Sequence, residues 1–250
     1  MKKFIFGMAK FSSLKYGLGK SKNITNINEG YDLLDFIYFK KKIKNFELSN
    51  RYNKSIPILS SFIKKNKCNT RIFYKIDNLK LKKNNLDSIL YDLKKIKDNL
   101  NIKHFENISL HQNDYSIISN NKIIKFLEKI KKNEIAKTIG TSIYTKKELI
   151  FSIKTDVYDS IQIPINPLNT YLYNLYTQQS IKKLIVARSI FLQGALLNKL
   201  NNHLFEKEIN SEISFLKKIA YQNNTSYKKI IFNFVKNLKS IDYIPKWIFK

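Results

Sequence analysis

The sequence has little cysteine, little arginine and no long apolar run. Its single cysteine, Cys68, excludes a disulfide within the chain and is typical of a reducing compartment. No segment approaches the ~18 consecutive apolar residues that a membrane-spanning helix needs. The opening MKKFIFGMAKF has a basic start, but Lys10 interrupts an apolar run shorter than the roughly 7–15 residues of a secretory signal. We therefore expect a cytoplasmic protein with no membrane segment.

The shortage of arginine bears on the strong positive charge of the chain. The 250 residues carry a formal net charge of +27, which by itself favours a nucleic acid or another polyanion as partner. Arginine is the better residue for bidentate contacts to phosphates and bases, yet the basic residues include only Arg51, Arg71 and Arg188. The lysines are scattered along the chain, together with much Asn, Ile, Tyr and Phe, as an AT-rich coding sequence produces. We expect no specific nucleic-acid partner, and polyanion binding stays the alternative.

No Pro/Gly/Ser-rich linker divides the chain, so we expect residues 1–250 to form one domain. Strand-like runs occupy 4–9, 42–48, 71–76, 105–111, 134–142, 158–166, 183–189 and 241–245. Helical patterns occupy 27–41, 54–66, 85–100, 121–132, 145–154, 172–182, 206–222 and 226–238. The strands recur at spacings typical of βα units, which predicts an α/β fold, the (β/α)8 TIM barrel. A doubly wound open sheet is the rival, but FGMAKFSSLKYGLGK lacks the Gly-x-Gly-x-x-Gly turn expected after its first strand.

Polar side chains follow one another at the predicted strand ends. The carboxyl ends of barrel strands meet at one rim, which holds the active site of such barrels. Each of these side chains alone has an ordinary structural explanation, but together they predict a site at this rim. They are Glu47 with Tyr52 in the loop after it, Lys75, His111, Ser142, Gln162 with Asn166 beyond it, and Arg188 with Ser189.

These groups suit proton delivery to a carbonyl oxygen. A tyrosine hydroxyl, whose ordinary pKa is about 10, is a weak acid at neutral pH, and a neighbouring ammonium stabilises its phenolate. A buried ammonium in turn needs a carboxylate as its counter-charge. We therefore expect Glu47 to hold Lys75, and Lys75 to lower the pKa of Tyr52. A neutral His111 would hydrogen-bond the substrate oxygen and orient it.

From about residue 4 to residue 245, the chain resembles the aldo-keto reductase family. FGMAKFSSLKYGLGK is similar to the opening strand and loop of that family, and FELSNRYNKS to its Asp-x-x-x-x-Tyr-Gly segment. RIFYKI is similar to the strand that supplies the family's lysine, and ISLHQND to the strand that supplies its histidine. The more specific matches, to cofactor-side segments, are IGTSIYTKKEL, SIQIPINPLN and VARSIFLQGALL. They most resemble reductases found with bacterial surface-sugar and glycan-modification pathways.

The resemblance implies a reductase that transfers a hydride from NADP or NAD, in reduced form, to a small aldehyde or ketone. Tyr52 would be the proton donor, Lys75 the residue that tunes it and His111 the orienting group. Glu47 stands where the family has aspartate. No metal is implied.

The resemblance also implies where the cofactor would lie. Ser142 and Gln162 would hold the nicotinamide carboxamide. Arg188 would lie near the nicotinamide ring, where many relatives have an aromatic residue, and Ser189 with the backbone after it would meet the pyrophosphate.

The sequence departs from the family pattern at several positions. Glu47 is one methylene longer than aspartate, which we expect to misplace Lys75, and Asn53 replaces a glycine after the tyrosine. Met8 and Lys10 alter the first loop. The sequence stops at IPKWIFK, without the family's glycine-containing loop and helix for the adenosine phosphate, so we expect weak cofactor binding with little preference between NADPH and NADH. The alternative function is a catalytically impaired barrel that serves as a binding or assembly protein.

Overall fold

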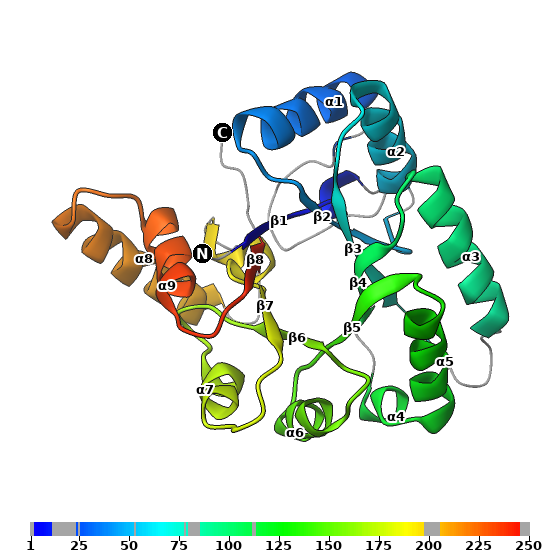
Figure 1. Ribbon diagram of the computed structural model, residues 1–250. Coiled ribbons are helices and arrows are strands. Elements are labelled where there is room, and N and C mark those ends of the chain that lie inside the picture. Colours follow the sequence, from blue (N-terminus) through cyan, green and yellow to red (C-terminus); the bar gives the residue numbers. More distant parts are fainter. Residues whose placement is uncertain are drawn as a thin grey trace.

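Eight parallel strands form a closed barrel in the computed structural model of the chain (Figure 1). The structure describes residues 3–11, 24, 26–52, 54–77, 79, 86–111, 114–197 and 206–245. Each strand pairs with the next along the chain, and β8 closes the ring by pairing with β1, so the predicted fold is confirmed. The strands are β1 (Lys3–Gly7), β2 (Asn45–Ser49), β3 (Arg71–Asp77), β4 (Phe105–His111), β5 (Ala136–Ser142), β6 (Ser160–Pro164), β7 (Leu184–Arg188) and β8 (Tyr243–Pro245).

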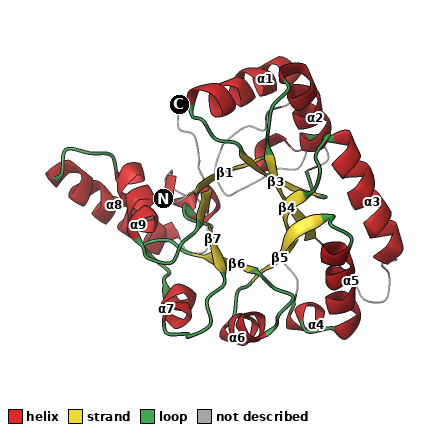
Figure 2. Cartoon of the chain, in the orientation of Figure 1, coloured by secondary structure: helices red, strands yellow, loops and turns green. Residues whose placement is uncertain are grey.

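Helices surround the strands on the outside of the barrel, as Figure 2 shows. They are α1 (Ile27–Asp35), α2 (Ser55–Asn66), α3 (Leu86–Asn99), α4 (Tyr115–Ile118), α5 (Asn121–Lys132), α6 (Lys146–Lys154), α7 (Tyr171–Thr177), α8 (Glu206–Gln222) and α9 (Tyr227–Asn237). A π-helical turn, η2 (Phe36–Lys40), follows α1, and the short 3-10 helices are η1 (Ala9–Phe11) and η3 (Leu192–Leu197). Among the described residues, no helix is long and apolar enough to cross a membrane.

Side-chain caps explain why α5 and α6 begin where they do. The Asn120 side chain accepts hydrogen bonds from the first backbone N–H groups of α5, which matches the predicted span 121–132. At α6, the Thr145 hydroxyl accepts from Glu148 N, and the Glu148 carboxylate accepts from Thr145 N at 3.0 Å. Such reciprocal bonds satisfy donors that the first helical turn leaves free.

The prediction that a helix covers 172–182 was too long at its carboxyl end. The helix α7 ends at Thr177. The buried Tyr176 accounts for the early stop, because its hydroxyl donates to Lys183 O at 2.7 Å and accepts from Lys183 N at 3.0 Å. These two bonds turn the chain back toward the start of β7. The short elements η1, α4 and η3 were not predicted.

The inside of the barrel is apolar in one part and polar in another. Ile5, Phe73, Val186 and Tyr243 form a small apolar cluster. On β4–β6 the interior is polar instead, and the buried Asn107 amide donates to Thr138 Oγ1 at 2.9 Å and to Ser160 Oγ at 2.8 Å. Gly140 leaves room for this network, because a Cβ there would lie 2.3 Å from Ser160 Oγ.

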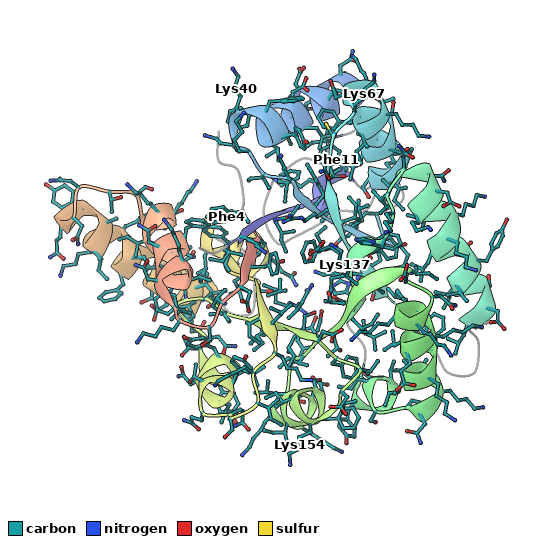
Figure 3. The ribbon with its side chains drawn as sticks, in the orientation of Figure 1. Phe4, Phe11, Lys40, Lys67, Lys137 and Lys154 are labelled. Carbon is teal, nitrogen blue, oxygen red and sulfur yellow. The ribbon has the colours of Figure 1, made fainter. Side chains whose placement is uncertain are left out.

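Basic side chains are spread over the outside of the molecule. Lys40, the last residue of η2, and Lys67, which follows α2, lie on one side of the barrel, and Lys154, the last residue of α6, lies on the opposite side (Figure 3). This placement agrees with the scattered lysines of the sequence.

Candidate active site

A buried ion pair joins β2 and β3 inside the barrel. Lys75 Nζ lies 2.7 Å from Glu47 Oε1. The strands are neighbours in the ring, and alternation along each strand turns both side chains inward. The extra methylene of Glu47 therefore does not hold the carboxylate away from the ammonium.

The two strands extend further than the sequence indicated. We predicted that Glu47 and Lys75 end their strands, and this was wrong, because β2 continues to Ser49 and β3 to Asp77. Ser49 pairs in register with Lys75, and Asp77 pairs with His111. Ser49 and Asp77 are buried strand residues, so the ion pair lies inside the barrel rather than at its edge.

Burial and neighbouring charges act in opposite directions on Lys75. Burial, the largest influence, lowers the pKa of the Lys75 ammonium below its ordinary value, and the positive charge of Arg188 lowers it further. The charge and hydrogen bond of Glu47 raise the same pKa and offset part of the fall. Glu47 is thus the group that favours the charged form of a lysine that burial would otherwise neutralise.

The environment of His111 keeps its imidazole neutral. His111 is the last residue of β4, and its Nδ1 lies 3.8 Å from Asp77 Oδ2. Burial, then the positive charges of Lys75, Arg188 and Arg51, lowers the pKa of His111 to about 2. At neutral pH the ring is uncharged, as a group that orients a substrate oxygen by hydrogen bonding requires.

Asp77 is a site residue that the sequence reasoning missed. Its buried carboxylate forms an ion pair with Arg51, with 3.1 Å between Asp77 Oδ2 and Arg51 Nε. The Asn50 side chain pairs with the Asp77 backbone, because Oδ1 accepts from Asp77 N at 2.9 Å and Nδ2 donates to Asp77 O at 3.2 Å. The signal was present in the sequence, since Asp77 lies two residues after Lys75 on the same strand face.

The loop that is fastened to Asp77 leads directly into Tyr52. Tyr52 is buried, and its backbone N–H donates to Ser49 O at 2.9 Å. Its carbonyl accepts from Ser55 N at 2.9 Å and from Ser55 Oγ at 2.6 Å. The backbone of Tyr52 is thereby held between the end of β2 and the first turn of α2. Asn53, the predicted departure after the tyrosine, lies outside the described residues.

Amide and hydroxyl groups on β5 and β6 connect with the ion pair. Ser142, the last residue of β5, pairs in register with Gln162, and its hydroxyl donates to Gln162 Oε1 at 3.4 Å. The other end of the same amide, Nε2, donates to Glu47 Oε2 at 3.3 Å. The structure thus brings Glu47, Lys75, Gln162 and Ser142 into one hydrogen-bonded network.

Arg188 and Ser189 mark the carboxyl end of β7. The Arg188 guanidinium carbon lies 4.4 Å from the centroid of the Tyr144 ring, a contact that the sequence reasoning missed although Tyr144 follows Ser142 by two residues. Asn166 Nδ2 donates to Ser189 O at 3.3 Å. Ser189, Leu192 and Gln193 have φ values of 53°, 47° and 53°, a left-handed backbone that non-glycine residues adopt infrequently.

Met8 and Lys10 are the other positions at which the sequence departs from the family pattern. Met8 is buried in the main core cluster, so it packs rather than faces the site. The Lys10 carbonyl accepts from Ile24 N at 2.9 Å, and residues 12–23 between them lie outside the described residues, as do 246–250. Among the described residues, no group of three or more His, Cys, Asp and Glu side chains is arranged to hold a metal ion.

No protein-family model matches the sequence, and no curated protein sequence is significantly similar to it. Solved structures resemble the fold over nearly the whole chain. A thermostable aldo-keto reductase in complex with the inhibitor epalrestat has a TM-score of 0.71 at 16% identity, over 99% of this chain and 85% of that one. An aldo-keto reductase from Bacillus halodurans in its holo form has a TM-score of 0.71 at 13% identity, over 97% and 80%.

A third similar structure contains a nicotinamide cofactor. It is an aldo/keto reductase from Klebsiella pneumoniae in complex with NADP and acetate, with a TM-score of 0.67 at 11% identity, over 98% of this chain and 80% of that one. Likeness at such low identity establishes the fold and leaves the chemistry to the residues. The chain therefore has a (β/α)8 barrel, as its sequence predicted, and this barrel is similar to those of solved aldo-keto reductases.

Proposed function

We propose that this protein is an NADP- or NAD-dependent oxidoreductase of the aldo-keto reductase type, which reduces an aldehyde or ketone. The observation that carries the proposal is the buried ion pair of Lys75 and Glu47, 2.7 Å apart, inside a barrel whose mouth also holds the neutral His111. Burying a lysine together with its carboxylate adds little to stability, so a buried pair at the mouth of the barrel favours a chemical role. The sequence resemblance supports a substrate from surface-sugar or glycan metabolism.

In this proposal Tyr52 delivers the proton to the carbonyl oxygen. The ammonium of Lys75 stabilises the phenolate that Tyr52 becomes, and Glu47 keeps that ammonium charged and in place. The Asn50 and Arg51 contacts to Asp77 fix the loop from which Tyr52 projects. Proton donation by a well-placed group contributes about 10²–10⁴ in rate.

His111 would bind the same carbonyl oxygen as a neutral imidazole. A charged imidazolium would compete with Tyr52 for the role of acid, and the low pKa of His111 removes that competition at neutral pH. His111 therefore orients the substrate, and the proton comes from Tyr52.

The donor set on β5–β7 fits the nicotinamide half of the cofactor. Ser142 and Gln162 are bonded to each other, and a carboxamide would pair with the second N–H of Gln162 Nε2 and with the remaining lone pairs of Gln162 Oε1 and Ser142 Oγ. Ser189 and the left-handed backbone after it would meet the pyrophosphate, and Arg188 would lie near the nicotinamide ring. When bound, the cofactor would supply the hydride.

Replacing the proposed acid tests this function. We expect Tyr52→Phe to reduce NADPH- or NADH-dependent turnover of a panel of aldehydes and ketones by about 10²–10⁴. Cofactor affinity, measured by fluorescence titration, should change little. Tyr221→Phe removes the same hydroxyl from an exposed tyrosine on α8 and serves as the matched control.

Two results would count against the proposal. Full turnover by Tyr52→Phe would show that another group delivers the proton. Cofactor binding without turnover of any carbonyl by the wild-type protein would favour the impaired barrel that acts as a binding or assembly protein.

A further inference from the structure

Five charged side chains gather at the carboxyl ends of the strands, and four of them form pairs. Lys75 pairs with Glu47, and Arg51 pairs with Asp77. The fifth, Arg188, is a cation at the end of β7. The two pairs cancel their own charges, so among these five described side chains the uncompensated positive charge belongs to Arg188.

Arg188 lacks a polar partner among the residues that the structure describes. Its Nη1 atom is buried and makes no hydrogen bond there, and no described carboxylate lies within ion-pair distance. Of the 19 Asp and Glu residues in the sequence, only Glu206 has a side chain outside the described part. A buried guanidinium N–H without an acceptor is costly, so an acceptor is expected to arrive with a ligand.

Arg188 points toward the reacting end of the proposed site. Val186, two residues earlier in β7, belongs to the cluster inside the barrel, and strand alternation places Arg188 on the same face. Tyr144 lies against the guanidinium, whose Cζ is 4.4 Å from the centroid of the ring. The charge of Arg188 also lowers the pKa of both Lys75 and His111, so it acts on the groups that would surround the carbonyl.

We propose that Arg188 binds a carboxylate of the substrate, so that the preferred substrates are carbonyl compounds that also carry a carboxylate, of the 2-oxo acid class. This inference rests on the proposed function. The planar guanidinium matches a carboxylate through two parallel hydrogen bonds. A cofactor phosphate is the other source of an anion, but strand alternation places Arg188 on the inner face of the barrel, the face that carries Lys75 and would meet the reacting carbonyl.

Calorimetric titration with two small probes tests the inference without turnover. Oxamate is an unreactive analogue of a 2-oxo acid, and oxamide is its uncharged counterpart. We expect the wild-type chain to bind oxamate more tightly than oxamide, both alone and when saturated with NADPH. Arg188→Met should weaken oxamate binding by about 10- to 100-fold and leave oxamide binding unchanged.

Arg71→Met is the matched control, because its loss removes the same charge. Arg71 is exposed and lies at the amino end of β3, away from the site at the carboxyl ends of the strands. The variant should keep the oxamate affinity of the wild type at equal ionic strength. The control matters because a chain of net charge +27 attracts every anion weakly.

Three results would overturn the inference. They are equal oxamate binding by Arg188→Met and the wild type, no preference of the wild type for oxamate over oxamide, and displacement of oxamate by NADPH. If Arg188→Met fails to fold, the comparison of oxamate with oxamide binding by the wild type still tests the inference. Turnover of neutral aldehydes without any carboxylate preference contradicts only this inference, whereas oxamate binding without turnover of any carbonyl contradicts only the proposed function.

Discussion

The two halves of the barrel mouth differ in how their charges are arranged. On β2–β4, Lys75 and Asp77 each have an opposite charge within 3.1 Å, and the histidine beside them is neutral. On β5–β7, the described side chains at the carboxyl ends of the strands are hydroxyls, amides and one cation, Arg188, and none of these side chains forms an ion pair with another described residue. The first half is organised before any ligand binds, whereas the second half keeps hydrogen-bonding groups that a ligand can use.

The difference follows from what each half would do. Proton transfer needs fixed geometry and charges that stay in place during the reaction, and buried pairs supply both. Binding needs groups whose partners arrive with the ligand. Gln162 links the halves, because one end of its amide accepts from Ser142 and the other donates to Glu47.

Removing Lys75 should have the largest effect on the stability and activity of the β2–β4 half. Lys75→Met leaves Glu47 in the interior without its counter-charge, so we expect a loss of about 3–5 kcal/mol in the free energy of unfolding. Turnover should fall by about 10²–10⁴. Urea denaturation and steady-state kinetics measure the two effects.

The double variant Glu47→Gln with Lys75→Met distinguishes the effect of the buried charge on stability from the effect of Lys75 on catalysis. It should regain most of the lost stability and none of the activity, because no unpaired charge stays buried. A double variant as unstable as Lys75→Met would show that the pair is not what stabilises this half.

Breaking the contact of Asp77 with the β2 loop should have a smaller effect. Asp77→Asn removes the charge that holds Arg51, which lets the backbone of Tyr52 shift, and a shift of ~1 Å lowers kcat by about 100-fold. Arg51→Gln should have the same effect, and combining both changes should add little more. Additive losses in a kinetic double-mutant cycle would show that the two residues act separately.

The pH dependence sharpens the account of Lys75. Burial lowers the pKa of Lys75 while Glu47 raises it, and turnover needs the charged form, so activity should fall at alkaline pH below the ordinary lysine value. Glu47→Gln removes the influence that raises this pKa. The alkaline limb of kcat/KM should therefore move to lower pH in the variant, and an unmoved or upward-moved limb would contradict this assignment.

The smallest expected effect lies in the β5–β7 half. Tyr144→Leu removes the ring that supports Arg188, and a partly exposed cation–π contact is worth about 0.5–1 kcal/mol, so oxamate binding should weaken by only about 2- to 5-fold. Tyr144→Phe keeps the ring and should bind oxamate as the wild type does. Equal loss in both variants would assign the effect to the hydroxyl.

The sequence predicted the barrel because strand and helix periodicities repeat along it. The helices expected at 121–132 and 206–222 have those bounds in the structure, since caps and apolar faces are local properties. What could not be predicted depends on register between strands. β2 and β3 extend further than predicted because Ser49 lies opposite Lys75 and Asp77 lies opposite His111. Beyond Ser49, the Asn50 side chain forms the hydrogen bonds to the Asp77 backbone that a strand residue would otherwise form.

Some residues of the candidate site could also have been predicted from the sequence. Alternation would have placed Asp77 and Tyr144 on the faces of Lys75 and Ser142, but no local pattern states which cation each one meets. Arg51 meets Asp77 because β2 and β3 are neighbours in the sheet, and Arg188 meets Tyr144 because β5 and β7 both flank β6.

Label transfer tests the central claim most directly. The wild-type chain is incubated with NADPH that carries deuterium at the transferable position and with a 2-oxo acid, and the product alcohol is analysed by mass spectrometry. We predict deuterium on the former carbonyl carbon for the wild type and for Tyr221→Phe, and about 10²–10⁴ slower labelling for Tyr52→Phe. An unlabelled product from the wild type, or equal labelling by Tyr52→Phe, would contradict the account.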